Sequence, residues 1–208
     1  GGYAAGIDAT IDNDATTKEI RYLVKAFKKS GKKEYLQAAE KGIAYLLKAQ
    51  YANGGWPQYY PDFSSYRSEI TFNDNAMINV LNVLDNVVRR ANGMEVINPA
   101  FVGKCREAIT KGIDCILKTQ VLQQGKLTAW CAQYDAKTLQ PAKARKYELP
   151  SLSGSESVGI LRFLMSVDKP SPEIINAVKS GIEWLDKVKI SGYRFVQVDA
   201  PGTPKGKD

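Results

Sequence analysis

The hydrophobic pattern of the chain repeats along its length. The segment at residues 41–50 (KGIAYLLKAQ) returns at residues 111–120 (KGIDCILKTQ), and a shorter copy (SGIEWL) begins at residue 180. In each copy the apolar residues recur three or four positions apart, which predicts an amphipathic helix. The sequence therefore predicts three copies of one helical element.

A second helical segment precedes each copy. Its apolar residues have helical spacing at 20–27, 78–84 and 160–164, and short polar residues come directly before it, at 10–16 (TIDNDAT), 71–77 (TFNDNAM) and 151–157 (SLSGSES). Ser, Thr, Asn and Asp commonly cap the free N–H groups at a helix start. The repeating unit is thus predicted to be a helical hairpin.

Long loops rich in glycine and aromatic residues follow the second helix of each hairpin, at residues 54–69, 125–150 and from 191 onward. Repeated hairpins bury their apolar faces on their neighbours and form a solenoid or, when the array closes, a toroid. The length and aromatic content of the loops favour an all-α (α/α)3 toroid, with one domain over residues 1–208. In such an array the three polar segments and the three long loops lie at one face.

Charge and residue types narrow the chemistry expected at that face. The formal charge is +7, which favours an acidic partner, and histidine is absent. No nucleic-acid recognition motif appears, and no apolar run is long enough to span a membrane, so neither partner is expected. The three cysteines, an odd number, are predicted to be buried thiols rather than a disulfide framework.

The polar segments are candidates for a metal site. Asp12, Asn13 and Asp14 precede the first helix, and Asp74 precedes the third. Carboxylates that point into one space repel each other unless a cation binds between them, and oxygen ligands without His or Cys suit Ca²⁺ or Mg²⁺. The same residue types also serve as simple helix caps, so both interpretations stay open at this point.

The loops add aromatic and cationic side chains to the same face. Rings stack on sugar faces, and an arginine fork binds a carboxylate through two hydrogen bonds, so together they suit an acidic sugar chain. The alternative is that the rings only pack the loops onto the helices. The residues concerned are Trp56, Tyr59, Tyr60, Tyr66, Trp130, Tyr134, Lys143, Arg145, Lys146, Tyr147, Tyr193 and Arg194.

Five stretches resemble the pectate lyases of polysaccharide lyase family 10: residues 10–16, 54–61 (GGWPQYYP), 70–77 (ITFNDNAM), 130–135 (WCAQYD) and 141–157 (PAKARKYELPSLSGSES). The resemblance implies an (α/α)3 toroid that cleaves polygalacturonate by anti-β-elimination. It also implies Ca²⁺ between the enzyme and a substrate carboxylate, and an arginine as the base. We expect a secreted or periplasmic protein, with no signal peptide in this chain.

Carried over residue by residue, the resemblance assigns roles to positions of this chain. Asp12 and Asp74 match acidic metal-site positions, with Asn13 and Asp14 beside them, and Arg145 matches an arginine that binds the substrate carboxylate. The arginine that acts as the base is expected beyond residue 208. The protein is expected to be a monomer or part of a larger modular enzyme. The expected substrate-binding residues are Trp130, Gln133, Tyr134, Lys143, Tyr147 and Arg162.

Two other functions remain open on the sequence. One is a relative that binds acidic glycans without cleaving them. The other is a different (α/α) glycan-active enzyme, for example a glycoside hydrolase that uses Asp14 and Glu156 as paired carboxylates.

Overall fold

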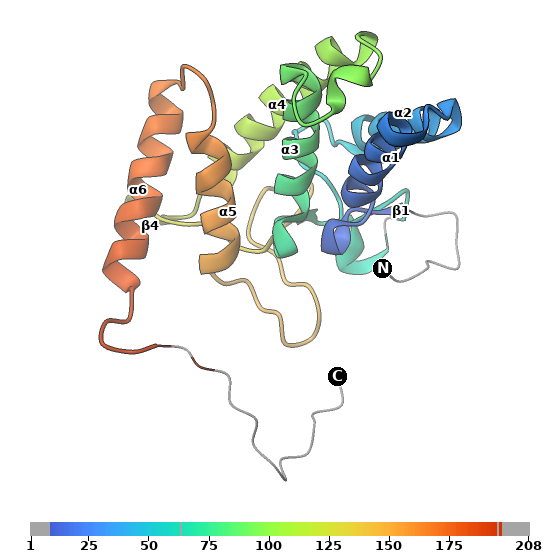
Figure 1. Ribbon diagram of the computed structural model, residues 1–208. Coiled ribbons are helices and arrows are strands. Elements are labelled where there is room, and N and C mark those ends of the chain that lie inside the picture. Colours follow the sequence, from blue (N-terminus) through green and yellow to red (C-terminus); the bar gives the residue numbers. More distant parts are fainter. Residues whose placement is uncertain (1–8, 63, 195, 197–208) are drawn as a thin grey trace.

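The computed structural model describes residues 9–62, 64–194 and 196. Within them six α-helices form three antiparallel hairpins (Figure 1). The first helices of the hairpins are α1 (Thr17–Ser30), α3 (Ala76–Arg89) and α5 (Gly154–Met165). The second helices are α2 (Lys33–Ala49), α4 (Ala100–Thr119) and α6 (Pro172–Val188).

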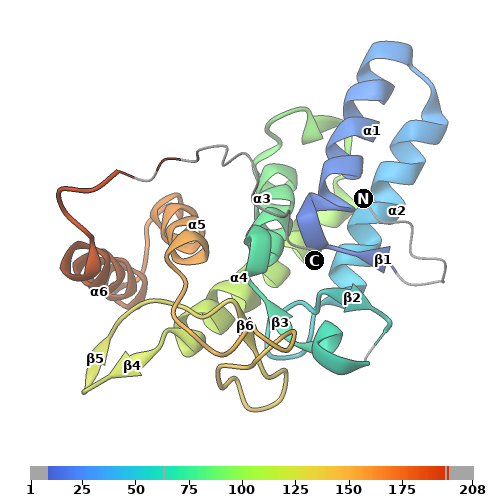
Figure 2. The same ribbon diagram turned by 90° about the horizontal axis from the view of Figure 1, so that it is seen from below.

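The hairpins stand side by side in an arc. Helix α3 contacts both α1 and α5, and α4 contacts both α2 and α6, so the helices form two rows (Figure 2). This arrangement confirms the all-α class and the three repeated hairpins. No helix in the described ranges has the length and apolar character needed to cross a membrane.

Helix α1 shows how the sequence pattern sets the orientation of each helix. Ile20 and Val24 are buried, whereas Tyr22, between them in sequence, points away from the core and is 69% exposed. The helix ends at Gly31, whose φ of 72° is the left-handed conformation that glycine adopts without steric cost. The chain can therefore reverse within a few residues and pair α2 with α1.

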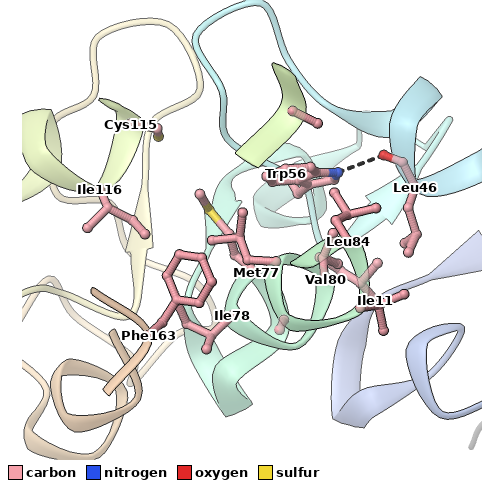
Figure 3. Close-up of a cluster of buried hydrophobic side chains, with 14 of the residues drawn as sticks. Ile11, Leu46, Trp56, Met77, Ile78, Val80, Leu84, Cys115, Ile116 and Phe163 are labelled. Carbon is pink, nitrogen blue, oxygen red and sulfur yellow. Dashed lines mark hydrogen bonds between the residues drawn. The ribbon is translucent and has the colours of Figure 1, made fainter. Parts of the chain in front are cut away.

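Helix α3 is the central element and the most deeply buried. It packs against neighbours on several sides, so apolar residues surround much of its circumference rather than a single stripe. Figure 3 shows Met77, Val80 and Leu84 of α3 in the same cluster as Trp56. Burying each such side chain contributes roughly 1.5–3 kcal/mol, which makes α3 the main packing surface of the molecule.

Two tryptophans join successive hairpins in the same way. Trp56 Nε1 donates to the Leu46 carbonyl at 2.7 Å (Figure 3), and Trp130 Nε1 donates to the Ile116 carbonyl at 2.8 Å. Each ring then lies against a glycine of the next second helix. A Cβ atom would lie 3.2 Å from the Trp56 ring if added at Gly112, and 3.4 Å from the Trp130 ring if added at Gly181.

Two glutamines reinforce these joints. Gln50 Nε2 donates to the Ala108 carbonyl of α4 at 2.9 Å, and Gln120 Nε2 donates to the Ala177 carbonyl of α6 at 3.0 Å. The third hairpin has Lys189 at the corresponding position, paired with Asp186 instead. The Trp and Gln contacts together define what we call the hairpin joints.

The loops hold the starts of neighbouring first helices together. In the first loop, the Gln58 carbonyl accepts from Ile11 N and the Trp56 carbonyl accepts from Thr71 N. In the second loop, the Ala132 carbonyl accepts from Phe72 N and the Trp130 carbonyl accepts from Ser153 N. Each loop thus spans two helix starts, and the three starts are aligned along one face.

Short antiparallel strand pairs support these links. Strand β1 (Ala9–Thr10) pairs with β2 (Tyr59–Tyr60), and β3 (Ile70–Thr71) pairs with β6 (Gln133–Tyr134). A separate hairpin of β4 (Leu122–Gln123) and β5 (Lys126–Leu127) lies beside α6. The cysteines Cys105, Cys115 and Cys131 are free and buried, as predicted.

Candidate functional site

Two matching 3-10 turns precede α1 and α3, at Asp12–Asp14 and Asn73–Asn75. In each turn the last two residues have positive φ: 49° and 61° at Asn13 and Asp14, and 52° and 57° at Asp74 and Asn75. Asn and Asp enter this left-handed region more readily than other residues with a Cβ, which explains why the turns consist of them. The two turns therefore share one backbone geometry.

In each turn, the side-chain amide of an asparagine orients the carboxylate of the aspartate next to it in sequence. Asn13 Nδ2 donates to Asp12 Oδ2 at 3.0 Å, and Asn73 Nδ2 donates to Asp74 Oδ2 at 2.9 Å. The acid and the amide have exchanged positions between the two copies. Both copies nevertheless keep one oriented carboxylate.

The carboxylates of the two turns are brought to one rim, as the sequence predicted. The two turns contact each other, and the second also contacts α5. Burial raises the pKa of Asp74, and the negative charges of Asp12 and Glu156 raise it further. We call the group Asp12, Asp74 and Glu156 the acidic rim.

Glu156 supports the acidic rim through hydrogen bonds. Its Oε1 accepts from the backbone N of Asp74 at 3.3 Å, and its other oxygen accepts from Ser153 Oγ. Sequence reasoning placed Glu156 at this face but missed its link to the Asp74 turn. The link depends on the close approach of two helix starts that lie 82 residues apart in sequence.

Arg145 brings positive charge to the acidic rim, consistent with its expected role. Its charge lowers the pKa of Asp74, opposing the larger upward effects of burial and of the neighbouring acids. Its guanidinium is bound to Glu148, with Nε 2.9 Å from Oε1, and its side chain is 73% exposed. An ion pair this exposed contributes little stability and can exchange for another carboxylate.

Asp14, also expected at the metal site, makes contacts of its own at the start of α1. Its Oδ1 accepts from Arg21 NH1 at 3.0 Å and from the hydroxyl of Thr17. These side-chain contacts anchor the start of α1 to the turn that carries Asp14. Asn13 remains beside Asp12, where its amide acts as a donor.

The aromatic wall expected from residues 130–135 is not formed as predicted. Trp130 and Tyr134 are fully buried and Gln133 is 7% exposed, so neither ring can stack on a sugar. Tyr134 accepts from Cys131 N at 2.6 Å and meets Phe72 edge to face at 5.8 Å. These residues are packed in the core and do not form a surface for a sugar. The repeat indicated this role for Trp130, because Trp56 makes the same buried hydrogen bond in the preceding hairpin.

The three other expected substrate-binding residues, Lys143, Tyr147 and Arg162, differ in their position relative to Arg145 and the acidic rim. Lys143 and Tyr147 are exposed on the loop that carries Arg145, and Lys146 Nζ lies 5.2 Å from the centroid of the Tyr147 ring. Arg162 is exposed in the last turn of α5, six residues after Glu156, or about 9 Å further along the helix. Lys143 and Tyr147 therefore remain available beside Arg145, whereas Arg162 lies away from the acidic rim.

The donor set at the rim fits an oxygen-binding cation only in part. Asp12 and Asp74 supply carboxylates, but the described ranges contain no group of three or more His, Cys, Asp or Glu arranged to hold a metal. Ca²⁺ takes six to eight oxygen ligands, so an ion here needs further oxygens from water or from an acidic ligand. The rim is thus compatible with a cation that the protein and its ligand hold jointly.

Two hollows on the described surface can be compared with the position of the acidic rim. The larger, of about 1030 Å³, lies between the β4–β5 hairpin and α6 and is lined by none of the rim residues. The smaller, of about 520 Å³, starts at Asn13 and Asp14 and follows α1. Only the smaller hollow adjoins the candidate site.

Comparisons with known proteins place this scaffold of helical hairpins in a class, the pectic acid lyases. The pectic acid lyase family model matches residues 3–205, so the chain belongs to that family. No curated protein matched the sequence.

Two solved structures of one enzyme have the same fold as this chain. One is the family 10 polysaccharide lyase from Cellvibrio cellulosa, with 43% identity and a TM-score of 0.82. The other is a mutant of that enzyme in complex with trigalaturonic acid, with 42% identity and a TM-score of 0.82. Each match covers 86% of this chain and 56% of the solved chain, so the chain spans little more than half of its relatives. The matched family 10 polysaccharide lyase fold is an (α/α)3 toroid, of which the described helices form an arc.

Proposed function

We propose that the acidic rim and Arg145 form the site of a pectate lyase that cleaves polygalacturonate by β-elimination. The observation that carries the proposal is the contact between the Asp12–Asp14 and Asn73–Asn75 turns, with the charge of Arg145 close enough to lower the pKa of Asp74, in a member of the pectic acid lyase family. The complex of the Cellvibrio cellulosa mutant with trigalaturonic acid supports an oligogalacturonate ligand.

Asp12 and Asp74 are the residues that would hold Ca²⁺. The bound ion would neutralise the carboxylate of the sugar and stabilise the negative charge that develops when the expected arginine base takes the neighbouring proton. The electron pair left on carbon would then form the double bond and expel the glycosidic oxygen. The mutual repulsion within the acidic rim supports this proposal, since a cation relieves it.

Arg145 has the geometry for a second contact with the sugar. Its planar fork now binds Glu148, and a galacturonate carboxylate can replace that partner with two parallel hydrogen bonds. Lys143 and Tyr147 on the same loop would add charge and a ring surface beside it. We further propose that the protein acts outside the cell, where a polymeric substrate is accessible.

The test is incubation with polygalacturonate and Ca²⁺ while the ultraviolet absorbance of the unsaturated product is followed. We expect the absorbance to rise and a chelator to stop it. No rise with the intact chain would refute cleavage.

A non-catalytic glycan-binding module is the second candidate, favoured by the small donor set of the rim in the described ranges. It predicts retardation on a pectate-containing gel without unsaturated product. The glycoside hydrolase alternative is less favoured because both members of its expected pair are engaged, Asp14 with Arg21 and Thr17 and Glu156 with Ser153 and the backbone N of Asp74. New reducing ends without the unsaturated chromophore would revive it.

A further inference from the structure

The hollow along α1 is separate from the acidic rim but begins next to it. It occupies about 520 Å³ and extends from Asn13 and Asp14 past Lys18 and Tyr22 to Lys25. The amide of Asn13 also bonds to Asp12, so one residue belongs to both places. A chain bound at the rim can therefore continue into the hollow.

Helical geometry places a ring between two cations on the floor of this hollow. Lys18, Tyr22 and Lys25 are spaced i, i+4 and i+7, so they share one face of α1, opposite the buried Ile20 and Val24. Lys18 and Lys25 are about 10 Å apart along the helix axis. Tyr22 is 69% exposed, so its ring is accessible to a ligand.

The charges in the hollow leave these two lysines uncompensated by ion pairs. Asp14 and Arg21 neutralise each other at 3.0 Å. Among the described residues, neither Lys18 nor Lys25 is within ion-pair distance of a carboxylate. Glu19 also lines the hollow and weakens its positive potential without cancelling both lysines.

We propose that the α1 hollow is a distal binding site for the anionic polyuronate chain whose cleaved bond lies at the acidic rim. Lys18 and Lys25 bind carboxylates of the chain, and the ring of Tyr22 lies against a sugar face. The identity of the polymer rests on the proposed function, whereas the site itself rests on the geometry and charge of α1. A ligand must extend beyond the rim to reach Tyr22, so only long chains gain from the site.

The test compares short and long oligogalacturonates. Trigalacturonate and a chain of roughly ten units are titrated against the wild type, the double variant Lys18→Ala/Lys25→Ala and Tyr22→Ala. We expect the variants to bind the long chain about threefold to tenfold more weakly and the trimer with unchanged affinity. Equal affinity for the long chain in wild type and double variant would overturn the proposal.

A matched control separates the site from general charge. Lys104→Ala/Lys179→Ala removes the same net charge from exposed positions on α4 and α6, and we expect it to leave long-chain affinity unchanged. In the opposite direction, Glu19→Gln should tighten long-chain binding about twofold. An equal loss in both double variants would show only nonspecific attraction of a polyanion.

The binding readout also distinguishes this proposal from the proposed function. If the double variant binds long chains more weakly than the wild type does, but the wild type forms no unsaturated product, cleavage fails and the distal site stands. If it forms product while the variants bind both lengths as the wild type does, cleavage stands and the distal site fails. A titration with polyglutamate adds one check, since equal sensitivity of its binding to Tyr22→Ala would contradict ring–sugar contact.

Discussion

The hairpin joints and the acidic rim arise from the same sequence repeat but follow opposite rules. At the joints, corresponding residues are identical: Trp56 and Trp130 make the same hydrogen bond and pack on corresponding glycines. At the rim, corresponding residues differ, since Asp12 aligns with Asn73 and Asn13 with Asp74. Only the oriented carboxylate is kept from one turn to the next.

This difference teaches how to divide the roles of repeated residues. A joint has the same geometric task each time, so the same side chain fits each time. The rim is a single site assembled from unlike contributions, which requires the copies to diverge. Variants at the joints should therefore affect stability, and variants at the rim should affect activity.

The largest expected effect is on activity at the rim. Asp74→Asn should lower the rate of product formation about 100-fold or more, as is typical when one electrostatic stabiliser is removed. The free energy of unfolding should stay the same or rise slightly, because burial and the charges of Asp12 and Glu156 disfavour ionised Asp74. Initial rates and chemical denaturation measure both quantities. Asp14→Asn is the matched control and should retain most of the activity, and equal losses in both variants would remove the distinction between them.

The largest expected effect on stability lies at the second joint. Trp130→Ala should lower the free energy of unfolding by about 3–5 kcal/mol, the usual cost of emptying a buried aromatic site. Trp130→Phe keeps most of the ring but loses the hydrogen bond to Ile116, and should cost less. Thermal and denaturant unfolding check the order. A folded Trp130→Ala protein with wild-type stability and weakened sugar binding would show that Trp130 contacts the sugar and does not stabilise the joint.

A smaller loss is expected for the glutamine contact of the same joint. Gln120→Leu leaves the carbonyls of Thr128 and Ala177 without their donor, which should cost about 1–3 kcal/mol. The exposed Gln37 of α2 provides the control, and Gln37→Leu should change the free energy of unfolding by less than about 0.5 kcal/mol. Denaturant titration of both variants decides whether the contact stabilises the joint.

The smallest expected effect is a pH dependence of stability that arises from Glu69 in the first loop. Burial and, to a lesser extent, Asp135 raise the pKa of Glu69. The folded state therefore binds more protons than the unfolded state just above the ordinary glutamate pKa, and stability falls as pH rises through that window. Glu69→Gln should flatten this decline in denaturation curves recorded from about pH 4 upward. The exposed Glu107→Gln should leave it in place, and a wild-type slope in Glu69→Gln would exclude this residue as its source.

Most of the fold that could be predicted from the sequence followed from its internal repeat. Apolar spacing and the recurring polar segments were enough for three hairpins and one common face, because both depend on local periodicity. The convergence of Asp12 and Asp74 followed from the direction of the helices. Burial of Trp130 and Tyr134 did not follow, since aromatic residues in a glycine-rich loop suit a sugar groove and a packed joint equally well.

The roles of individual carboxylates were also beyond the sequence. Asp12 and Asp14 are two residues apart, and only the positive φ angles of the turn decide that Asp14 meets Arg21 while Asp12 remains beside Asn13. Glu156 was visible as an acidic residue, but its hydrogen bond to Asp74 N depends on tertiary packing. Local pattern predicts which residues reach the rim, and the turn geometry decides what each does there.

The central claim is that Asp12 and Asp74 hold a cation jointly with an acidic sugar. Calorimetric titration of Ca²⁺ in the absence and presence of trigalacturonate tests it most directly, since linkage requires each ligand to tighten the other. We expect weak Ca²⁺ binding alone, clearly tighter binding with the trimer, and loss of this coupling in Asp74→Asn. Ca²⁺ affinity that is the same with and without the trimer would contradict the account.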